Sequence, residues 1–333
     1  MQAIGGYFEL ADYEQGKGFP HQGGILLNTG RNALEYILRC IGKVRCIYLP
    51  YYTCEVVLEP LKRLHIPYIF YHINAMFELV EDIHLKEGEY IIANNYFGLK
   101  DAYIKLLAEK YGEHLIVDCA QAFFAKPISG IKSFYSTRKF VGVADGGIAV
   151  GIQDSRAFDY EEDDSTFHSS HLLTRKKEGA EAGFRQYQEN ELKLENLPVR
   201  RMSCETQDIL SHINYERIIA QRRSNFKYLH EALNSSNCLH LPSYESFSCP
   251  MVYPYMGKTN QDLRKELIKN KVFVARYWPN VLSWVPINCQ EFLFAEKLIP
   301  LPIDQRYGEE EMKYIVTLLS TKNRQAFFEM IEI

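Results

Sequence analysis

The stretch that decides the fold is Ile116-Val117-Asp118-Cys119-Ala120-Gln121, an apolar run that ends in an acid. Its pattern is typical of a short buried strand with Asp118 at the carboxyl end. In open α/β sheets, ligands bind outside the carboxyl ends of the strands. A carboxylate there can pair with a protonated pyridine nitrogen of a ligand, or it can cap the next helix. The segment alone leaves both interpretations open.

Short apolar strands and helical segments alternate around this stretch. The expected strands are 46–49, 68–73, 90–94, 115–118 and 147–151. Residues 24–41 are expected to form a turn and then a helix, and further helices are expected over 54–64 and 101–111. Such alternation predicts the α/β class, with a mostly parallel central sheet covered by helices.

The second half of the chain has a different pattern. Residues 154–195 form a polar insertion in which EEDD (161–164) and TRKK (174–177) are expected to be solvated, and 202–233 has the pattern of one long helix or two. We expect a large domain over residues 1–239, including both segments. A smaller α+β domain is expected over 240–333.

A second motif is Ser136-Thr137-Arg138-Lys139, followed by Asp145-Gly146-Gly147. A lysine amine can form a Schiff base with an aldehyde cofactor, and a serine hydroxyl can hold a phosphate. Paired glycines allow close approach of the backbone. A lone S-x-x-K occurs often by chance, so this motif is informative only beside the others.

Two further segments carry charge or glycine at helix starts. In Asn28-Thr29-Gly30-Arg31, a glycine opens a helix whose N–H groups and dipole favour an anion such as phosphate. Arg200-Arg201 could reach a phosphate or a carboxylate. Each segment is also compatible with an ordinary helix start.

Taken together and in this order, the motifs resemble the DegT/StrS family of sugar aminotransferases. LPYYTCEVVLEPL, NNYFGLKDAYIKLLAEKYG, RRMSCETQDIL and AEKLIPLPIDQRYGEEEMKYIVTLL resemble further family segments, so the similarity spans nearly the whole chain. It implies the fold of pyridoxal phosphate (PLP)-dependent transferases of fold type I.

The resemblance also implies roles for individual residues. Lys139 is the implied Schiff-base lysine, six residues before Asp145, and Asp118 is the implied partner of the pyridine nitrogen. Gln121 is placed against the cofactor ring. Gly30 and Arg31 supply backbone N–H groups to its phosphate, and Ser136 supplies a hydroxyl.

The sequence departs from the family pattern at three positions. Phe134 stands where the family has its serine, Cys54 replaces an aromatic that often stacks on the ring, and Val199 replaces an asparagine that reaches the partner's cofactor. Arg138 precedes Lys139, and an ungapped alignment from Ser133 would put arginine at the lysine position.

The activity implied by the resemblance is transamination. An amino acid, with glutamate as the expected donor, passes its amino group to a keto-sugar, expected on a nucleotide, in surface-polysaccharide or related sugar biosynthesis. The family's homodimers share their active sites. The substrate or partner-subunit candidates, chosen by position and residue type, are Tyr96, Arg200, Arg201, Arg276, Tyr277, Trp278 and Arg306.

Three alternative functions compete with this interpretation. PLP-dependent sugar dehydratases replace the lysine, usually by histidine, and no histidine neighbours position 139. A PLP-fold protein kept as a binding or regulatory module remains open because of Cys54 and Val199. A nicotinamide oxidoreductase needs G-x-G-x-x-G after the first strand, which the sequence does not contain.

Composition bounds the partners and the location. The net charge is −4, without a basic excess for nucleic acid, and no apolar run reaches the length of a membrane span. Eight cysteines without a CxxC pair, and a first segment unlike a secretory signal, favour the cytoplasm. The histidines show no ligand spacing, so no metal is expected.

Overall fold

A computed structural model describes residues 3–16, 18–152, 159–258 and 263–331. The first five residues of the polar insertion, 154–158, therefore lie outside the described residues.

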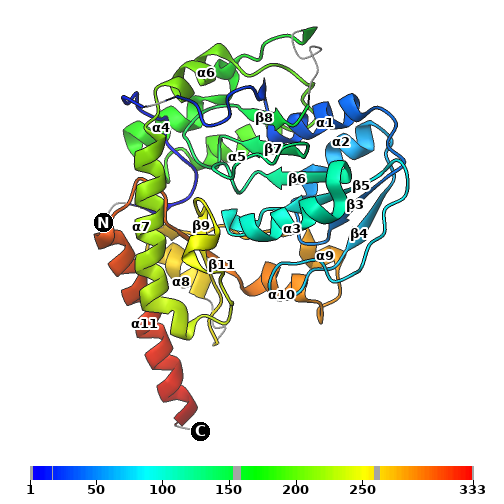
Figure 1. Cartoon of the computed structure of the whole chain (residues 1–333). Helices are drawn as coiled ribbons and strands as arrows, with labels where there is room; N and C mark the ends of the chain where they lie inside the picture. Colours follow the sequence, from blue (N-terminus) through cyan, green and yellow to red (C-terminus); the bar gives the residue numbers. More distant parts are fainter. Residues whose placement is uncertain (1–2, 17, 153–158, 259–262, 332–333) are drawn as a thin grey trace.

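The centre of the structure is a seven-stranded sheet in the order β2-β8-β7-β6-β5-β3-β4 (Figure 1). Its strands are β2 (Ile25–Leu27), β3 (Cys46–Pro50), β4 (Tyr68–Tyr71), β5 (Glu89–Asn94), β6 (Leu115–Cys119), β7 (Lys132–Ser136) and β8 (Gly147–Val150). Five of them, from β7 to β4, pair in parallel, whereas β8 is antiparallel to both of its neighbours. The predicted mostly parallel sheet is confirmed.

Helices bury both faces of this sheet, which explains why its strands are almost continuously apolar. Helices α1 (Gly30–Ile41) and α2 (Leu58–Arg63) cover one face, where Leu34, Leu61 and Ile92 belong to one core cluster. Helix α3 (Asp101–Tyr111) lies over the other face, where Leu107 and Val117 belong to a second, larger cluster.

The polar region and the C-terminal part add the remaining elements. They are α4 (Ser170–Glu178), α5 (Phe184–Lys193), α6 (Cys204–Ser211), α7 (Tyr215–Leu233), β9 (Val252–Tyr255), α8 (Leu263–Lys269), β10 (Val272–Phe273), α9 (Val281–Trp284), α10 (Gln290–Lys297), β11 (Ile299–Pro302) and α11 (Glu309–Ile331). Strands β9 and β11 form an antiparallel pair, and α7 packs along α11 (Figure 1).

The start of the chain pairs with its C-terminal part. Strand β1 (Ile4–Gly5) is parallel to β10, and the Gly5 N–H donates to the Tyr307 hydroxyl at 2.8 Å. The division into 1–239 and 240–333 stays a prediction. The first residues contribute to the C-terminal half of the structure, a long-range pairing that no local pattern announces.

The expected strands and helices of the first half are present, within a few residues at their ends. Strands β2 and β7 and helices α4 and α5 were not predicted. Strand β2 is only three residues long, and β7 begins and ends with polar residues. Among the described residues, no helix is long and apolar enough to cross a bilayer.

The two charged runs of the polar insertion are not simply solvated, contrary to expectation. Asp163 is buried and accepts a hydrogen bond from Asn28 Nδ2 at 3.0 Å. Arg175 is also buried, and its Nε donates to Glu9 at 3.0 Å. Charged residues become buried when partners from distant segments compensate them, and such partners cannot be found from local pattern.

Candidate active site

Two adjoining cavities open at the carboxyl ends of β6 and β7. The first has a volume of about 170 Å³, and the second about 280 Å³. Ser136, Arg138, Lys139 and Glu191 line both cavities, so the two spaces meet at the turn that follows β7. This is the edge of the sheet at which ligands of α/β proteins bind.

One end of the first cavity is built by the start of α1. The Thr29 hydroxyl caps this helix by accepting from the Asn32 N–H at 3.1 Å. The next amides have no partner within the helix, as at every helix start. A Cβ on Gly30 would lie 3.5 Å from Ser136 Cβ, so Gly30 and Ser136 face the same space. Helix N–H groups and a hydroxyl together suit a phosphate.

Arg31 lines the first cavity, but its guanidinium is bound by other residues of the chain and is not free to bind a ligand. Its Nη1 donates to Glu59 at 2.9 Å and to the Leu194 carbonyl at 3.0 Å. The guanidinium is thus already neutralised by a carboxylate. What Arg31 offers the cavity is its place in the first turn of α1.

The glycine pair after Asp145 allows β8 to pack against this helix start. A Cβ on Gly147 would lie 2.1 Å from the Thr29 carbonyl oxygen, a distance that no side chain tolerates. The Gly146 N–H donates to the Asn28 carbonyl at 2.6 Å. Asp145 itself turns away from the cavity and accepts from Ser203 N and Oγ, at 2.8 and 2.7 Å, at the start of α6.

Asp118 lies at the end of β6, where the sequence placed it, and lines the first cavity. Its Oδ1 accepts from the Ala120 N–H at 2.8 Å. Burial raises the pKa of Asp118, while the positive charge of Lys139 acts in the opposite direction. A buried carboxylate beside a cavity can stabilise a cation placed there.

Lys139 and Arg138 are neighbours with different environments. Among the described residues, the half-buried Lys139 has no hydrogen bond or ion pair, so its amine is available to a ligand. Arg138 instead forms an ion pair with Glu191 of α5. Burial acts to raise the pKa of Glu191, but the charge and hydrogen bond of Arg138, with smaller contributions from Arg31 and His171, together lower it.

Strand alternation decides between the two serines near Lys139. Successive side chains of a strand point to opposite faces. Phe134 and Ser136 line the first cavity, whereas Ser133 and Tyr135 line a separate pocket on the other side. Ser136 is therefore the serine that the structure brings to the site.

Two amide side chains at the first cavity have unsatisfied polar atoms. Gln121 Oε1 accepts from the Phe97 N–H at 3.1 Å, but its buried Nε2 lacks an acceptor among the described residues. Asn94 Nδ2 donates to Thr53, and its buried Oδ1 has no donor there. Buried polar groups usually have partners, so unpaired ones beside a cavity indicate a polar ligand.

The remaining wall of the first cavity comes from the C-terminal part and from α5. Trp278 lines this cavity beside Cys54, and Tyr277 lines the second one. The cavity thus has an aromatic side chain although position 54 does not supply it. Both aromatic residues were candidates from the sequence.

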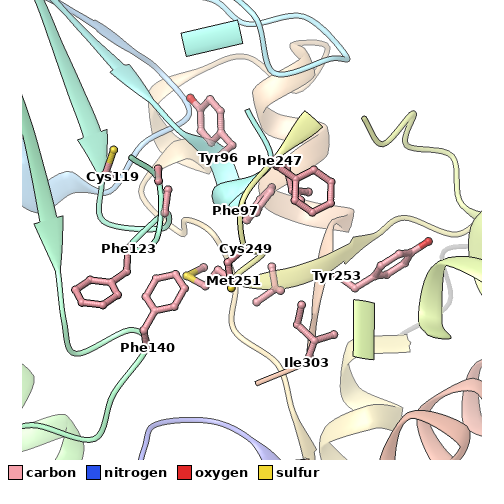
Figure 2. Close-up of a cluster of buried hydrophobic side chains, with 14 of the residues drawn as sticks. Tyr96, Phe97, Cys119, Phe123, Phe140, Phe247, Cys249, Met251, Tyr253 and Ile303 are labelled. Atoms are coloured by element: carbon pink, nitrogen blue, oxygen red, sulfur yellow. The ribbon is translucent and has the colours of Figure 1, made fainter. Parts of the chain in front are cut away.

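Several other candidates line neither cavity. Arg200 pairs with Asp163 and Arg201 donates to the Tyr160 carbonyl, while Arg276 pairs with Glu296 and Arg306 with Asp304. Tyr96 is buried in the core, and its hydroxyl donates to the Tyr52 carbonyl at 2.8 Å. Figure 2 shows it beside Phe97 within the hydrophobic cluster. Residue type and position alone do not show which carboxylates and carbonyls already occupy these side chains.

The second cavity contains residues that sequence reasoning missed. His171 of α4, Tyr187 and Glu191 of α5, and Arg222 of α7 all line it. Burial, assisted by the Arg138 charge, lowers the pKa of His171 to about 4, so this ring is neutral at pH 7. The spacing of Tyr187, Glu191 and Leu194 along one face of α5 was the available signal.

Arg222 is a buried cation in the second cavity. Its Nε donates to Gln305 at 2.9 Å and its Nη1 to the Met251 carbonyl at 2.9 Å. Its buried Nη2 has no acceptor among the described residues. A guanidinium with spare donors is suited to a carboxylate.

Comparisons with known proteins bear on the fold. No protein-family model matches the chain, and no curated protein matches it in sequence. Several solved structures, however, match the fold of the chain. Spr1654 from Streptococcus pneumoniae in its PMP form is 14% identical, with 98% of this chain and 94% of that one covered and a TM-score of 0.65.

Two more similar structures are named for their activity or product. A DegT DnrJ EryC1 StrS aminotransferase from Brucella abortus is 16% identical, with a TM-score of 0.58 and coverage of 90% of this chain and 85% of that one. DesI in the presence of its TDP-sugar product is 14% identical, with a TM-score of 0.62 and coverage of 92% and 83%.

The chain has the PLP-dependent transferase fold type I. Within fold type I, the first cavity occupies the carboxyl edge of the large sheet. The identities of 14–16% establish the fold, and the chemistry of the site rests on the residues of this chain.

Proposed function

We propose that this chain is a PLP-dependent aminotransferase that moves an amino group from an amino acid, expected to be glutamate, to a keto-sugar carried on a nucleotide. One observation carries the proposal. In a chain of fold type I, a single cavity is lined by the free amine of Lys139 and the buried carboxylate of Asp118. The start of α1 and the Ser136 hydroxyl, which together suit a phosphate, line the same cavity.

The residues present fit PLP. Gly30, the first turn of α1 and Ser136 would hold the phosphate, and Lys139 would bind the aldehyde carbon covalently. Asp118 would keep the pyridine nitrogen protonated. The unpaired Gln121 Nε2 is a donor for the ring's oxygen substituent. When bound, PLP supplies an electron sink that makes the α-carbon of an amino acid acidic.

The side chains then divide the work of proton transfer and binding. The Lys139 amine, once free, is placed between the two cavities and can accept the proton from the α-carbon as a general base. Trp278 and Cys54 line the first cavity and would limit the access of water to the bound cofactor. Arg222 in the second cavity would bind a carboxylate of the amino donor.

The sugar acceptor is supported by structural similarity and not yet by any residue. DesI was solved with a TDP-sugar product, and this chain shares its fold at low identity. A nucleotide sugar, in surface-polysaccharide or related sugar biosynthesis, is therefore the proposed acceptor. The second cavity, about 280 Å³ in volume, adjoins Lys139 and is the proposed place for the reacting end of the sugar.

We further propose a cytoplasmic homodimer with shared active sites. The eight cysteines are all free, which fits a reducing compartment. Leu173, Phe184 and Leu192 are exposed on α4 and α5, two helices that pack against each other, and exposed apolar side chains of this size favour a partner. Light scattering that gives a monomer with full activity would contradict the dimer.

The first experiment is an absorbance spectrum of the purified protein with PLP, before and after borohydride, followed by peptide mapping. We expect a visible band that reduction fixes onto Lys139. Absence of the band, or a label on Lys126 or Lys132, would leave the chain as a binding module of fold type I. Glutamate should then convert the bound cofactor to its amine form, as transamination requires.

A further inference from the structure

A second group of reactive side chains lies away from both cavities, where the end of β4 meets the start of α10. His72 follows β4, Cys289 is the N-cap residue of α10, and Glu291 is in its first turn. One ligand atom from each lies within 4.8 Å of the others. His72 and Glu291 are 219 residues apart, so no spacing in the sequence predicts this cluster.

The distances fit a tetrahedral metal site. Zinc binds nitrogen and oxygen at about 2.0–2.1 Å and thiolate sulfur at about 2.3 Å, which places tetrahedral ligand atoms about 3.3–3.7 Å apart. His72 Nδ1 is 3.2 Å from Glu291 Oε1. The remaining distances, below 4.8 Å, require only small rotations of side chains.

The charge of Glu291 supports a cation at this place. Its side chain is 1% exposed, and among the described residues its partners are the His72 ring and the Ile73 N–H, at 3.2 and 2.7 Å. Neither is a permanent positive charge, and no lysine or arginine of the described chain pairs with it. A buried carboxylate of this kind is stabilised by a pairing cation or metal.

The three ligands are also held in position by their surroundings. The backbone N–H of His72 donates to both carboxylate oxygens of Glu81 at 3.0 Å. The Tyr51 ring packs against the His72 ring with centroids 4.7 Å apart. The Ile73 N–H fixes Glu291 Oε1. Such supporting contacts orient ligands before the metal arrives.

We propose that His72, Cys289 and Glu291 bind a divalent zinc-type metal ion, with water as the fourth ligand. Imidazole, thiolate and carboxylate together favour zinc over calcium or magnesium. None of the three residues lines either cavity. The ion would tie the edge of the large sheet to the C-terminal part of the chain, and would stabilise that contact without taking part in transamination.

The test is a titration of the full-length protein with cobalt(II), a spectroscopic substitute for zinc, followed by displacement with zinc. We expect one equivalent to bind, with a thiolate-to-cobalt absorption band that zinc abolishes. Cys289→Ser should remove the band and weaken binding at least about 10-fold, whereas Cys238→Ser, at an exposed cysteine outside the cluster, should change neither.

A second measurement does not depend on a variant that folds. Zinc should protect Cys289 of the wild-type protein from alkylation, mapped by mass spectrometry, while Cys238 stays reactive. His72→Ala should abolish this protection. The absence of a thiolate band in the wild type, or a band unchanged in Cys289→Ser, overturns the proposal whether or not PLP binds.

Discussion

The two walls of the first cavity differ in how they are built. The sheet wall, consisting of Gly30, Asp118, Ser136 and Lys139, comes from strand ends and turns within about 110 residues of each other. The helical wall, consisting of Glu191, Leu194 and Trp278, comes from the polar region and the C-terminal part. The sheet wall carries groups that suit a cofactor, and the helical wall closes the opposite side of the cavity. Chemistry and access are thus located in different parts of the chain.

The largest expected effect comes from the sheet wall at Lys139. Lys139→Ala removes the only free amine that lines the first cavity among the described residues, so transamination should fall by about 10⁴-fold, the upper end of what a general acid-base group contributes. Arg138→Gln alters the neighbouring cation, which is tied to Glu191, and should keep the borohydride label on Lys139. Single-turnover kinetics with glutamate measure the rate of transamination, and peptide mapping after borohydride locates the label. A label that persists in Lys139→Ala would mean that another lysine holds the cofactor, and a label lost in Arg138→Gln would mean that Arg138 is needed for cofactor binding.

The Asp118→Asn variant tests whether the buried carboxylate of the sheet wall supports turnover while it lowers the free energy of unfolding. Asp118→Asn should lower the turnover rate by about 10²-fold, because an amide cannot keep a ring nitrogen protonated.

The same change should stabilise the cofactor-free protein. Because burial raises the pKa of Asp118 against the opposing effect of Lys139, this carboxyl supports the fold only at low pH. That contribution is lost as the pH rises through the folded-state pKa. Urea unfolding at pH 7 should show cofactor-free Asp118→Asn more stable by about 1 kcal/mol, with the difference vanishing below about pH 4. Equal stability at both pH values would argue that Asp118 is not strained by burial.

Arg222 extends the comparison to the second cavity. Arg222→Lys keeps the charge but loses the forked donors, so the KM for the amino donor should rise about 10-fold while the borohydride label stays on Lys139. Arg223→Lys is the matched control, because Arg223 donates to the Phe247 and Ser248 carbonyls and lines neither cavity. An unchanged KM together with a lower free energy of unfolding would instead assign Arg222 a purely structural role.

The sheet wall could be predicted from the sequence because its signals are local. Asp118 ends an apolar run, and Lys139 stands a fixed distance before a glycine pair that packs against the Thr29 backbone. The parallel sheet followed from the same alternation of strands and helices. Residues placed by turns and strand ends carry their position in their immediate neighbours.

The part of the helical wall that α5 contributes could not be predicted in this way, although Trp278 was a candidate by position and residue type. Glu191 and Arg175 lie in a region whose composition indicates a solvated surface, and both are compensated by charges far away in sequence. Arg200 and Arg201 show the reverse case, since conspicuous basic residues are occupied by the acidic run near Asp163. Long-range ion pairs decide which charges remain free, and a single sequence does not specify them.

Tyr96 gives the smallest expected effect and tests where the site ends. It was a substrate candidate by type and position, yet its hydroxyl is buried and donates to the Tyr52 carbonyl. Tyr96→Phe should therefore cost about 1 kcal/mol in the free energy of unfolding and leave kcat and KM unchanged, since one buried hydrogen bond is lost away from the cavities. Denaturant unfolding and steady-state kinetics on the same preparation separate the two roles. A changed KM with unchanged stability would move Tyr96 from the core to the substrate, and would mean that the second cavity extends to η2 (Tyr96–Gly98) when substrate binds.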